Sequence, residues 1–284
     1  MEIKHRNKIR LAQHIQIHCG IDVSPDALFD IQCKRFHEYK RQFMNILGVI
    51  HRYKKLKEMS DSELASQTKK VVIFSGKSAP GYYIAKLIIK LINSAADVIN
   101  EDPRTSEFLK LVFIPNYNVS LAEIIIPASD ISQHISTAGT EASGTSNMKF
   151  VLNGGLIIGT VDGANIEIGE EVGKENIWLF GALTPEVEDI RHTQLFHPTV
   201  LDPELDFVVK SIQSGEFGEP YIFEPLLYLE TLATIDEAYK DKAAWAKRSI
   251  NAAASMGKFS SDRSIQDYAE NIWKITPVSQ PNDE

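Results

Sequence analysis

Residues 141–165 read Glu-Ala-Ser-Gly-Thr-Ser-Asn-Met-Lys-Phe, then Val-Leu-Asn-Gly-Gly, then Leu-Ile-Ile-Gly-Thr-Val-Asp-Gly-Ala-Asn. The small residues at the start predict a turn, and Asn147 to Leu152 predict a short helix that stops at Gly154-Gly155. The apolar run Leu156 to Val161 predicts a buried strand. The stretch therefore predicts a turn, a helix and a strand in succession, which is one unit of an α/β fold.

The turn from Ser143 to Ser146 has the features of an anion-binding loop. Its backbone N–H groups and the positive end of the following helix favour a phosphate. Lys149, four residues after Thr145, lies on the same helix face one turn further in. Pyridoxal 5'-phosphate needs such an amine, because its aldehyde forms a Schiff base with lysine while its phosphate is held separately. The alternative is an ordinary glycine-rich turn followed by a solvated lysine, and the spacing alone leaves both open.

The same strand, turn and helix pattern recurs along the chain. It predicts an α/β fold of the Rossmann-like type, a parallel sheet with flanking helices. The predicted strands are Ala27–Cys33, Lys70–Phe74, Leu111–Pro115, Leu156–Val161 and Ile177–Phe180. The predicted helices are Asn7–His18, a segment around Phe43–Tyr53, Tyr82–Asn93, a helix from about Ser120 with Glu123 completing a capping box, Pro203–Ser214, Pro225–Tyr239, Ala243–Ala254 and Asp262–Trp273. Residues 1–275 are expected to form a single domain with a helical C-terminal part, in which Trp245, Tyr268 and Trp273 pack inside. Residues 276–284 are expected to form a loosely ordered tail.

A second feature is the basic cluster Lys34 to Arg41, between a predicted strand and a predicted helix. The carboxyl ends of strands are where ligands bind in open α/β sheets. Several cations at the positive end of a helix repel one another and the helix dipole, a conflict that an anionic ligand would relieve. A solvated basic turn or a localisation signal is the alternative, although the interleaved Phe36, His37 and Tyr39 weaken it.

Composition excludes several classes of protein. The chain has 284 residues, 43% of them hydrophobic, and a formal net charge of -8. That charge argues against a nucleic-acid-binding or membrane-binding surface, because either normally has a basic face. The sequence shows neither a secretory signal nor a membrane span. Two cysteines, Cys19 and Cys33, predict no disulfide framework, and a cytoplasmic location is expected.

Two short motifs resemble a metal site and a nucleotide-binding loop but lack residues that such sites require. His14 and His18 have a spacing that could bind a metal, but no acidic third ligand lies nearby, so no metal site is predicted. The triplet Gly76-Lys77-Ser78 imitates the end of a nucleotide-binding P-loop. That motif requires a glycine five positions earlier, where this chain has Val71, so a plain strand-to-helix turn is expected.

Several longer motifs, in order across nearly the whole chain, carry a family resemblance. They are Phe29-Asp-Ile-Gln-Cys-Lys-Arg-Phe-His-Glu-Tyr-Lys-Arg41, Gly76-Lys-Ser-Ala-Pro-Gly-Tyr82, Asn116-Tyr117, Gln133-His-Ile-Ser-Thr-Ala-Gly139, Glu141-Ala-Ser-Gly-Thr-Ser-Asn-Met-Lys-Phe150, Asn153-Gly, Asp162-Gly-Ala-Asn165 and Gly257-Lys-Phe-Ser-Ser-Asp-Arg263. Together they resemble the pyridoxal-phosphate-binding C-terminal domain of the α-glucan (glycogen/starch) phosphorylases, which are two-domain glycosyltransferases of the GT-B type. Ser146 and Asn118 are similar to the plant-type branch of that family.

The resemblance implies an enzyme that uses inorganic phosphate to cleave terminal α-1,4-linked glucose from a glucan and releases glucose 1-phosphate. It implies that Lys149 holds pyridoxal 5'-phosphate as a Schiff base, and that the cofactor's phosphate takes part in the chemistry. The implied phosphate ligands of the cofactor are Thr145, the amide of Ser146, Gly144 and Lys34, with Tyr117 near its ring. Arg35 and Lys40 would hold the substrate phosphate. Glu141, Ser143 and Gly144 would bind glucosyl hydroxyls, with Tyr39 assisting.

Members of that family are about three times longer, so this chain resembles a truncated phosphorylase, and the segment from Glu230 to Ala238 is shorter than the family pattern. Three hypotheses follow: the catalytic half of a phosphorylase, a non-catalytic fragment that binds the cofactor or the parent enzyme, and a nucleotide-sugar glycosyltransferase. Lys149 separates the third from the others, since a nucleotide-sugar enzyme has no use for a Schiff-base lysine. The family suggests a homodimer for the full-length enzyme. A plastid location would need a transit peptide before residue 1.

Overall fold

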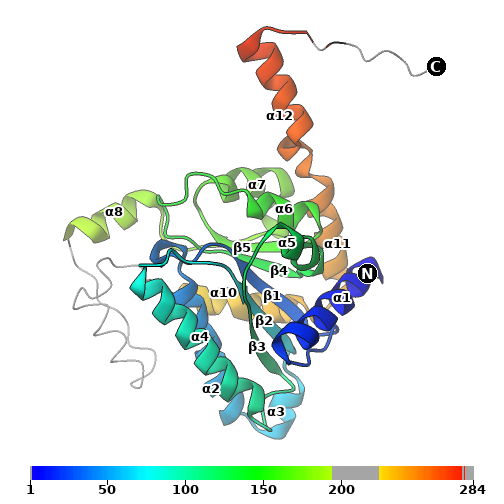
Figure 1. Cartoon of the computed structure of the whole chain (residues 1–284), viewed down its shortest axis with the longest axis vertical. Coiled ribbons are helices and arrows are strands. Elements are labelled where there is room, and N and C mark those ends of the chain that lie inside the picture. Colours follow the sequence, from blue (N-terminus) through cyan, green and yellow to red (C-terminus); the bar gives the residue numbers. More distant parts are fainter. Residues whose placement is uncertain (1, 194–223, 277, 279–284) are drawn as a thin grey trace.

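Six parallel strands form a central sheet in the computed structural model, which describes residues 2–193, 224–276 and 278 (Figure 1). The strands are β1 Leu28–Cys33, β2 Lys70–Ser75, β3 Leu109–Ile114, β4 Ile131–His134, β5 Leu156–Thr160 and β6 Trp178–Phe180. Their spatial order is β3-β2-β1-β4-β5-β6. The chain therefore runs outward in one direction from β1 and in the other from β4. The crevice beyond the carboxyl ends of these two strands is where such sheets bind ligands.

Helices cover both faces of the sheet. Their bounds are α1 Glu2–Cys19, α2 Gln42–Glu58, α3 Asp61–Ala65, α4 Tyr83–Glu101, α5 Val119–Ala128, α6 Ser146–Leu152, α7 Ala164–Val172, α8 Thr184–Thr193, α10 Pro225–Ala238, α11 Lys242–Ala254 and α12 Ser261–Asp267, with short helical turns η1 Glu38–Lys40, η2 Lys174–Asn176, η4 Met256–Phe259 and η5 Tyr268–Trp273. Helices α2, α4 and α10 pack on one face, and α1, α5 and α6 pack on the other.

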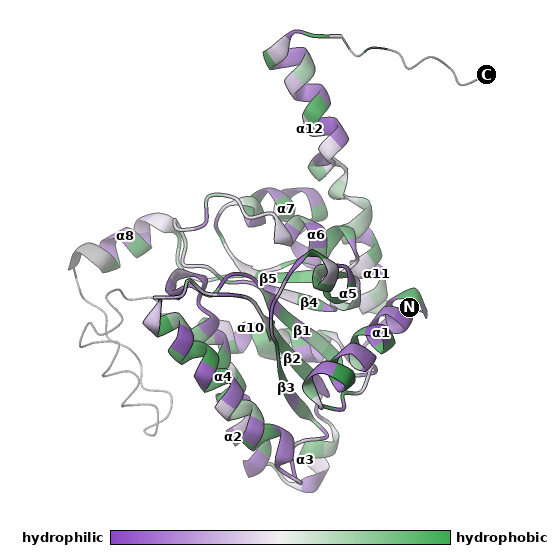
Figure 2. Ribbon diagram, in the orientation of Figure 1, coloured by the Kyte–Doolittle hydropathy of each residue, from purple (hydrophilic) through white to green (hydrophobic). Residues whose placement is uncertain are grey.

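The core lies between these layers, and the strands form its apolar centre (Figure 2). All residues of β1, β2 and β5 are buried, as expected for parallel strands covered on both faces. Polar residues on β1 and β4 are satisfied internally. Gln133 donates to Asp30 at 2.8 Å and accepts from the Tyr228 hydroxyl at 3.1 Å. This network links β1, β4 and α10.

The predicted parallel sheet with flanking helices is confirmed, and the five predicted strands correspond to β1, β2, β3, β5 and β6. Strand β4 was not predicted. The capping box at Ser120 is wrong: Asn118 caps α5, and its side chain accepts from the Leu121 N–H at 3.0 Å. The predicted helix Pro203–Ser214 lies outside the described residues.

Of the three aromatic residues predicted to pack inside, only Trp245 is buried. Tyr268 is 47% exposed and Trp273 is 51% exposed. The reason is that α12 and η5 project away from the sheet, so no other layer of the described structure covers them (Figure 1). The single-domain division at residue 275 stays a prediction. None of the helices in the described ranges has the length and apolarity needed to cross a bilayer.

Candidate functional site

A cavity of about 340 Å³ opens at the carboxyl ends of β1, β4 and β5. It lies at the point where the strand order reverses, so the topology of the sheet brings together loops that are distant in sequence. Its lining is polar and consists of Lys34, Lys40, His134, Ser136, Glu141, Ser143, Gly144, Thr145, Ser146, Asn147, Thr160, Asp162 and Asn165.

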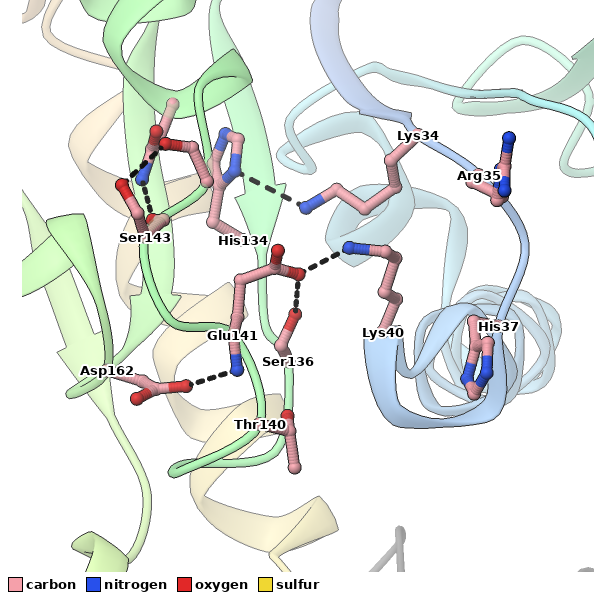
Figure 3. A network of polar contacts seen from close by, with 12 residues as sticks. Lys34, Arg35, His37, Lys40, His134, Ser136, Thr140, Glu141, Ser143 and Asp162 are labelled. Carbon is pink, nitrogen blue, oxygen red and sulfur yellow. Dashed lines mark hydrogen bonds and ion pairs between the residues drawn. The ribbon is translucent and has the colours of Figure 1, made fainter.

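Two lysines form one wall of the cavity. Lys34 follows the last residue of β1 and Lys40 closes η1, and their amines point toward the same space (Figure 3). The Lys40 amine forms an ion pair with Glu141, whose carboxylate also accepts from the Ser136 hydroxyl at 3.3 Å. Burial is the largest single influence on Lys40 and lowers its pKa, but the hydrogen bonds and charge interactions with Glu141 and Tyr39 together outweigh burial and raise the pKa above its ordinary value. Lys40 is therefore a charged residue already neutralised within the site.

Lys34 is in a different situation. Its amine lies 3.3 Å from Nδ1 of His134 and forms no ion pair with any described residue. Burial lowers the pKa of Lys34 to about 7, and the charge of Lys40 adds to this effect. Burial and the two neighbouring lysines also lower the pKa of His134, so the imidazole is neutral. An anion entering the cavity would meet Lys34 as its first uncompensated cation.

The opposite wall of the cavity is the loop that contains Glu141 and Ser143. Two hydrogen bonds hold this loop against the turn after β5. The N–H of Glu141 donates to the Asp162 carboxylate at 3.0 Å, and the N–H of Ala164 donates to the Ser143 carbonyl at 3.0 Å. Gly163, between the two hydrogen-bonded residues of the turn, has a φ of +49°. A Cβ at this position would lie 2.4 Å from the Glu141 carbonyl oxygen. Only glycine allows the turn to approach the loop this closely.

Replacing Gly163 with alanine is therefore expected to lower the free energy of unfolding by about 1–3 kcal/mol, through backbone strain and the clash with Glu141. Denaturant unfolding of the whole chain measures the loss. Gly257→Ala is the matched control, because a Cβ there would contact nothing within 4 Å. Equal stability of the two variants would show that these two hydrogen bonds do not depend on Gly163.

The structure brings seven of the predicted site residues to the cavity: Lys34, Lys40, Glu141, Ser143, Gly144, Thr145 and Ser146. Tyr39 lies beside it, with the Lys40 amine 4.7 Å from its ring centroid. The remaining three lie elsewhere. Arg35 is exposed and its side chain points away from the two lysines (Figure 3), and Lys149 is exposed on α6. Tyr117 is partly buried against the core under α1 and α5, where burial raises its pKa.

Six further lining residues had no predicted role: His134, Ser136, Asn147, Thr160, Asp162 and Asn165. Two of them shape the loop, since the Asn165 amide donates to the His134 carbonyl at 3.0 Å and its oxygen accepts from Asn147 at 3.1 Å. A usable signal was the segment Asp162-Gly-Ala-Asn165 directly after a predicted strand, which places Asp162 and Asn165 at the same sheet edge. His134 has no comparable signal. Its strand, β4, is mostly polar and is therefore not recognised as a strand from the sequence.

Comparison with known proteins gives a consistent result. A family model described as carbohydrate phosphorylase matches residues 1–275. Glycogen phosphorylase 2 of Dictyostelium discoideum is 53% identical over 301 residues, covering 99% of this chain and 30% of that protein. Alpha-glucan phosphorylase 2, cytosolic, of Arabidopsis thaliana is 50% identical over 98% of this chain and 36% of its own length. Glycogen phosphorylase of Saccharomyces cerevisiae is 49% identical over 98% of this chain and 34% of its own length. The chain thus spans about a third of the length of these relatives.

Proposed function

The chain belongs to the carbohydrate phosphorylase family, and we propose that it supplies the cofactor-binding part of an α-glucan phosphorylase. The reaction would be phosphorolysis of terminal α-1,4-linked glucose in a glycogen-type or starch-type glucan, with glucose 1-phosphate as product. The observation that carries this proposal is the identity of about one half, along almost the whole chain, to proteins named glycogen or alpha-glucan phosphorylase. The reaction would take place in the polar cavity at the carboxyl ends of β1, β4 and β5, where the strand order reverses.

The residues around the cavity fit the phosphate of pyridoxal 5'-phosphate. Lys34 supplies a partly buried cation that lacks an ion pair among the described residues. Thr145 and Ser146 contribute hydroxyls, and the first N–H groups of a helix have no partner within that helix. Gly144, which lines the cavity, has a φ of +81°, a backbone conformation that favours glycine. A cation, hydroxyls and backbone N–H groups are the donors that phosphate prefers.

Lys149 would be the covalent anchor of the cofactor. It lies one turn along α6 from Thr145, and its exposed side chain forms no ion pair with the described residues. The long lysine stem would have to turn toward the cavity, which costs little for an exposed flexible side chain. Tyr117 would lie near the cofactor ring, and this position would also require it to move from the packing seen here.

When bound, the cofactor would supply a phosphate that exchanges a proton with the substrate phosphate. Lys40 and Arg35 of this chain would hold the substrate phosphate, and the planar guanidinium of Arg35 suits such a group because it can bind two oxygens at once. Glu141, Ser143 and Gly144, assisted by Tyr39, would orient the glucosyl hydroxyls. Lys40 would then exchange its ion pair with Glu141 for the substrate phosphate, leaving the carboxylate to accept from sugar hydroxyls.

Borohydride reduction with pyridoxal 5'-phosphate is expected to label Lys149, and peptide mapping by mass spectrometry locates the label. Lys149→Arg should abolish labelling, because a guanidinium forms no stable Schiff base. Lys247→Arg, at an exposed position on α11, is the matched control and should keep it. Label distributed over surface lysines, or none, would remove the cofactor assignment and reopen the nucleotide-sugar alternative.

The second candidate function is a polypeptide that binds the cofactor, or the parent enzyme, without turnover. Release of glucose 1-phosphate from glycogen and inorganic phosphate by this polypeptide is the deciding assay. Little or no product is expected from the chain alone, and robust turnover would exclude the non-catalytic alternative.

A further inference from the structure

His134 takes part in a continuous chain of hydrogen bonds that ends inside the cavity. It is 6% exposed and comes at the end of β4. Its Nε2 lies 2.9 Å from the Ser132 hydroxyl oxygen. Its Nδ1 lies 3.3 Å from the Lys34 amine, a contact that Figure 3 shows. The Phe150 ring packs edge-on against the imidazole at 5.9 Å, so the imidazole is held from the side as well.

The direction of each bond follows from the charge on Lys34. An ammonium can only donate, so Nδ1 of the neutral imidazole presents its lone pair to Lys34. The single ring proton is then on Nε2, which donates to the Ser132 hydroxyl oxygen at 2.9 Å. The Ser132 hydroxyl proton is left to face the Leu156 carbonyl oxygen, 3.4 Å away. The lysine ammonium donates one of its three protons to Nδ1 and keeps two for the cavity.

We propose that His134 is a positioning residue for Lys34, holding the lysine amine through Nδ1 so that its other protons point at a bound phosphate ester. The proposal rests on the proposed function, because it concerns how the phosphate of the cofactor is held. It assigns to β4 a role that no motif indicated. Ser132 supports this arrangement, because its hydroxyl oxygen accepts the hydrogen bond from Nε2 and so stabilises the tautomer with the proton on Nε2.

The groups that face Lys34 decide how it titrates. They are His134 on β4, Lys40 on η1, Glu141 on the loop after β4, and Cys33 on β1. Among the described residues, only His134 contacts the amine directly. Removing the imidazole would leave the partly buried ammonium without its one direct hydrogen-bond partner among the described residues, so the amine would lose its proton at a lower pH. Both the affinity for a phosphate ester and the pH at which that affinity declines should therefore depend on His134.

The test measures binding of pyridoxine 5'-phosphate, which lacks the aldehyde and cannot react with lysine, by calorimetry from pH 6 to 9. His134→Leu is expected to weaken binding about tenfold and to move the decline in affinity to lower pH. His134→Gln, which can still present an oxygen to Lys34, should stay within about threefold of the unmodified chain. Ser132→Ala is a milder variant that should weaken binding in the same direction, because it releases the ring proton from Nε2. His18→Leu, exposed on α1, is the matched control and should change nothing.

The results distinguish a failure of the proposed function from a failure of the role proposed for His134. If the unmodified chain does not bind pyridoxine 5'-phosphate, the proposed function and this inference both fail. If it binds, and His134→Leu binds equally well with the same pH dependence, only the inference is overturned. The inference is also overturned if the leucine and glutamine variants are equally weak. A loss of affinity without a shift in pH dependence would assign His134 a packing role alone.

Discussion

Arg41→Met is expected to lower the free energy of unfolding by about 3–5 kcal/mol, because it leaves a buried carboxylate without its partner. Arg41 is 1% exposed, and its guanidinium donates to Glu224 at 2.8 Å and to the Ile135 carbonyl at 2.5 Å. Glu224 also accepts from the Ala182 N–H at 2.5 Å. This pair joins the segment after η1, the end of β4, the turn after β6 and the start of α10.

The same contact bears on the site, because Arg41 directly follows Lys40. Arg41 has a φ of +58°, an uncommon conformation for a residue with a side chain. The buried ion pair holds that conformation, so its loss should also displace the Lys40 amine from Glu141.

Denaturant unfolding measures the effect of Arg41→Met. The matched control is Arg263→Met, which removes an exposed pair with Asp267 at 2.6 Å and should cost less than about 1 kcal/mol. In the double variant Arg41→Met with Glu224→Leu, part of the stability should return, because neither partner then carries a buried charge. A loss below about 1 kcal/mol in Arg41→Met would show that this pair does not anchor the loop.

Lys34→Met is expected to have opposite effects on stability and on binding. The chain should become more stable at neutral pH, because folding without an anion places the Lys34 amine in a cavity where burial opposes its charge. Binding of pyridoxine 5'-phosphate should weaken about 10–100-fold, since a hydrogen bond from a charged donor is lost. An opposite sign for the two effects is the signature of a residue kept for function rather than for folding.

The pH dependence of this stability effect follows from the direction of the pKa shift. The folded-state pKa of Lys34, about 7, lies below 10.5, the ordinary value for a lysine in an unfolded chain. Between these values the unfolded chain binds more protons, so the contribution of Lys34 to stability becomes more favourable as the pH rises. The variant's advantage over the unmodified chain should therefore be largest below pH 7 and disappear near 10.5.

Unfolding of both proteins at pH 6 and pH 9 tests this, and Lys247→Met on the exposed face of α11 is the matched control. The effect of Lys34 is the difference in stability between the variant and the unmodified chain at each pH. Lys4 and Lys242, whose pKa values are lowered to about 8, also make stability rise with pH, and they do so equally in every protein tested. The affinity of the unmodified chain should also fall by up to about tenfold per pH unit above 7. A less stable Lys34→Met at pH 6, or one with undiminished affinity, would contradict this account.

Much of the fold was predictable because five of the six described strands are apolar runs bounded by turn residues. Strand β4 was not, and the reason is its composition. Ile131 is its single apolar residue, and the other three are Ser132, Gln133 and His134. All four are buried, and the polar ones find their partners on β1, β5, α10 and the loop carrying Lys34. Such partners are far away in the sequence, so no local pattern can indicate them.

The stretch 141–165 and the cluster 34–41 were sufficient to predict that their side chains meet at one sheet edge, since turns after parallel strands meet there. That this edge binds phosphate stays a prediction. Local sequence determines these turns through the conformational freedom of glycine and the helix-starting tendency of small hydroxyl residues. Only the tertiary structure decided which cations are neutralised: Lys40 pairs with Glu141, whereas Lys34 is left with a neutral imidazole. The physical reason is that burial and charge pairing depend on all elements around a group, and strand β4 brings its imidazole to Lys34 from 100 residues away.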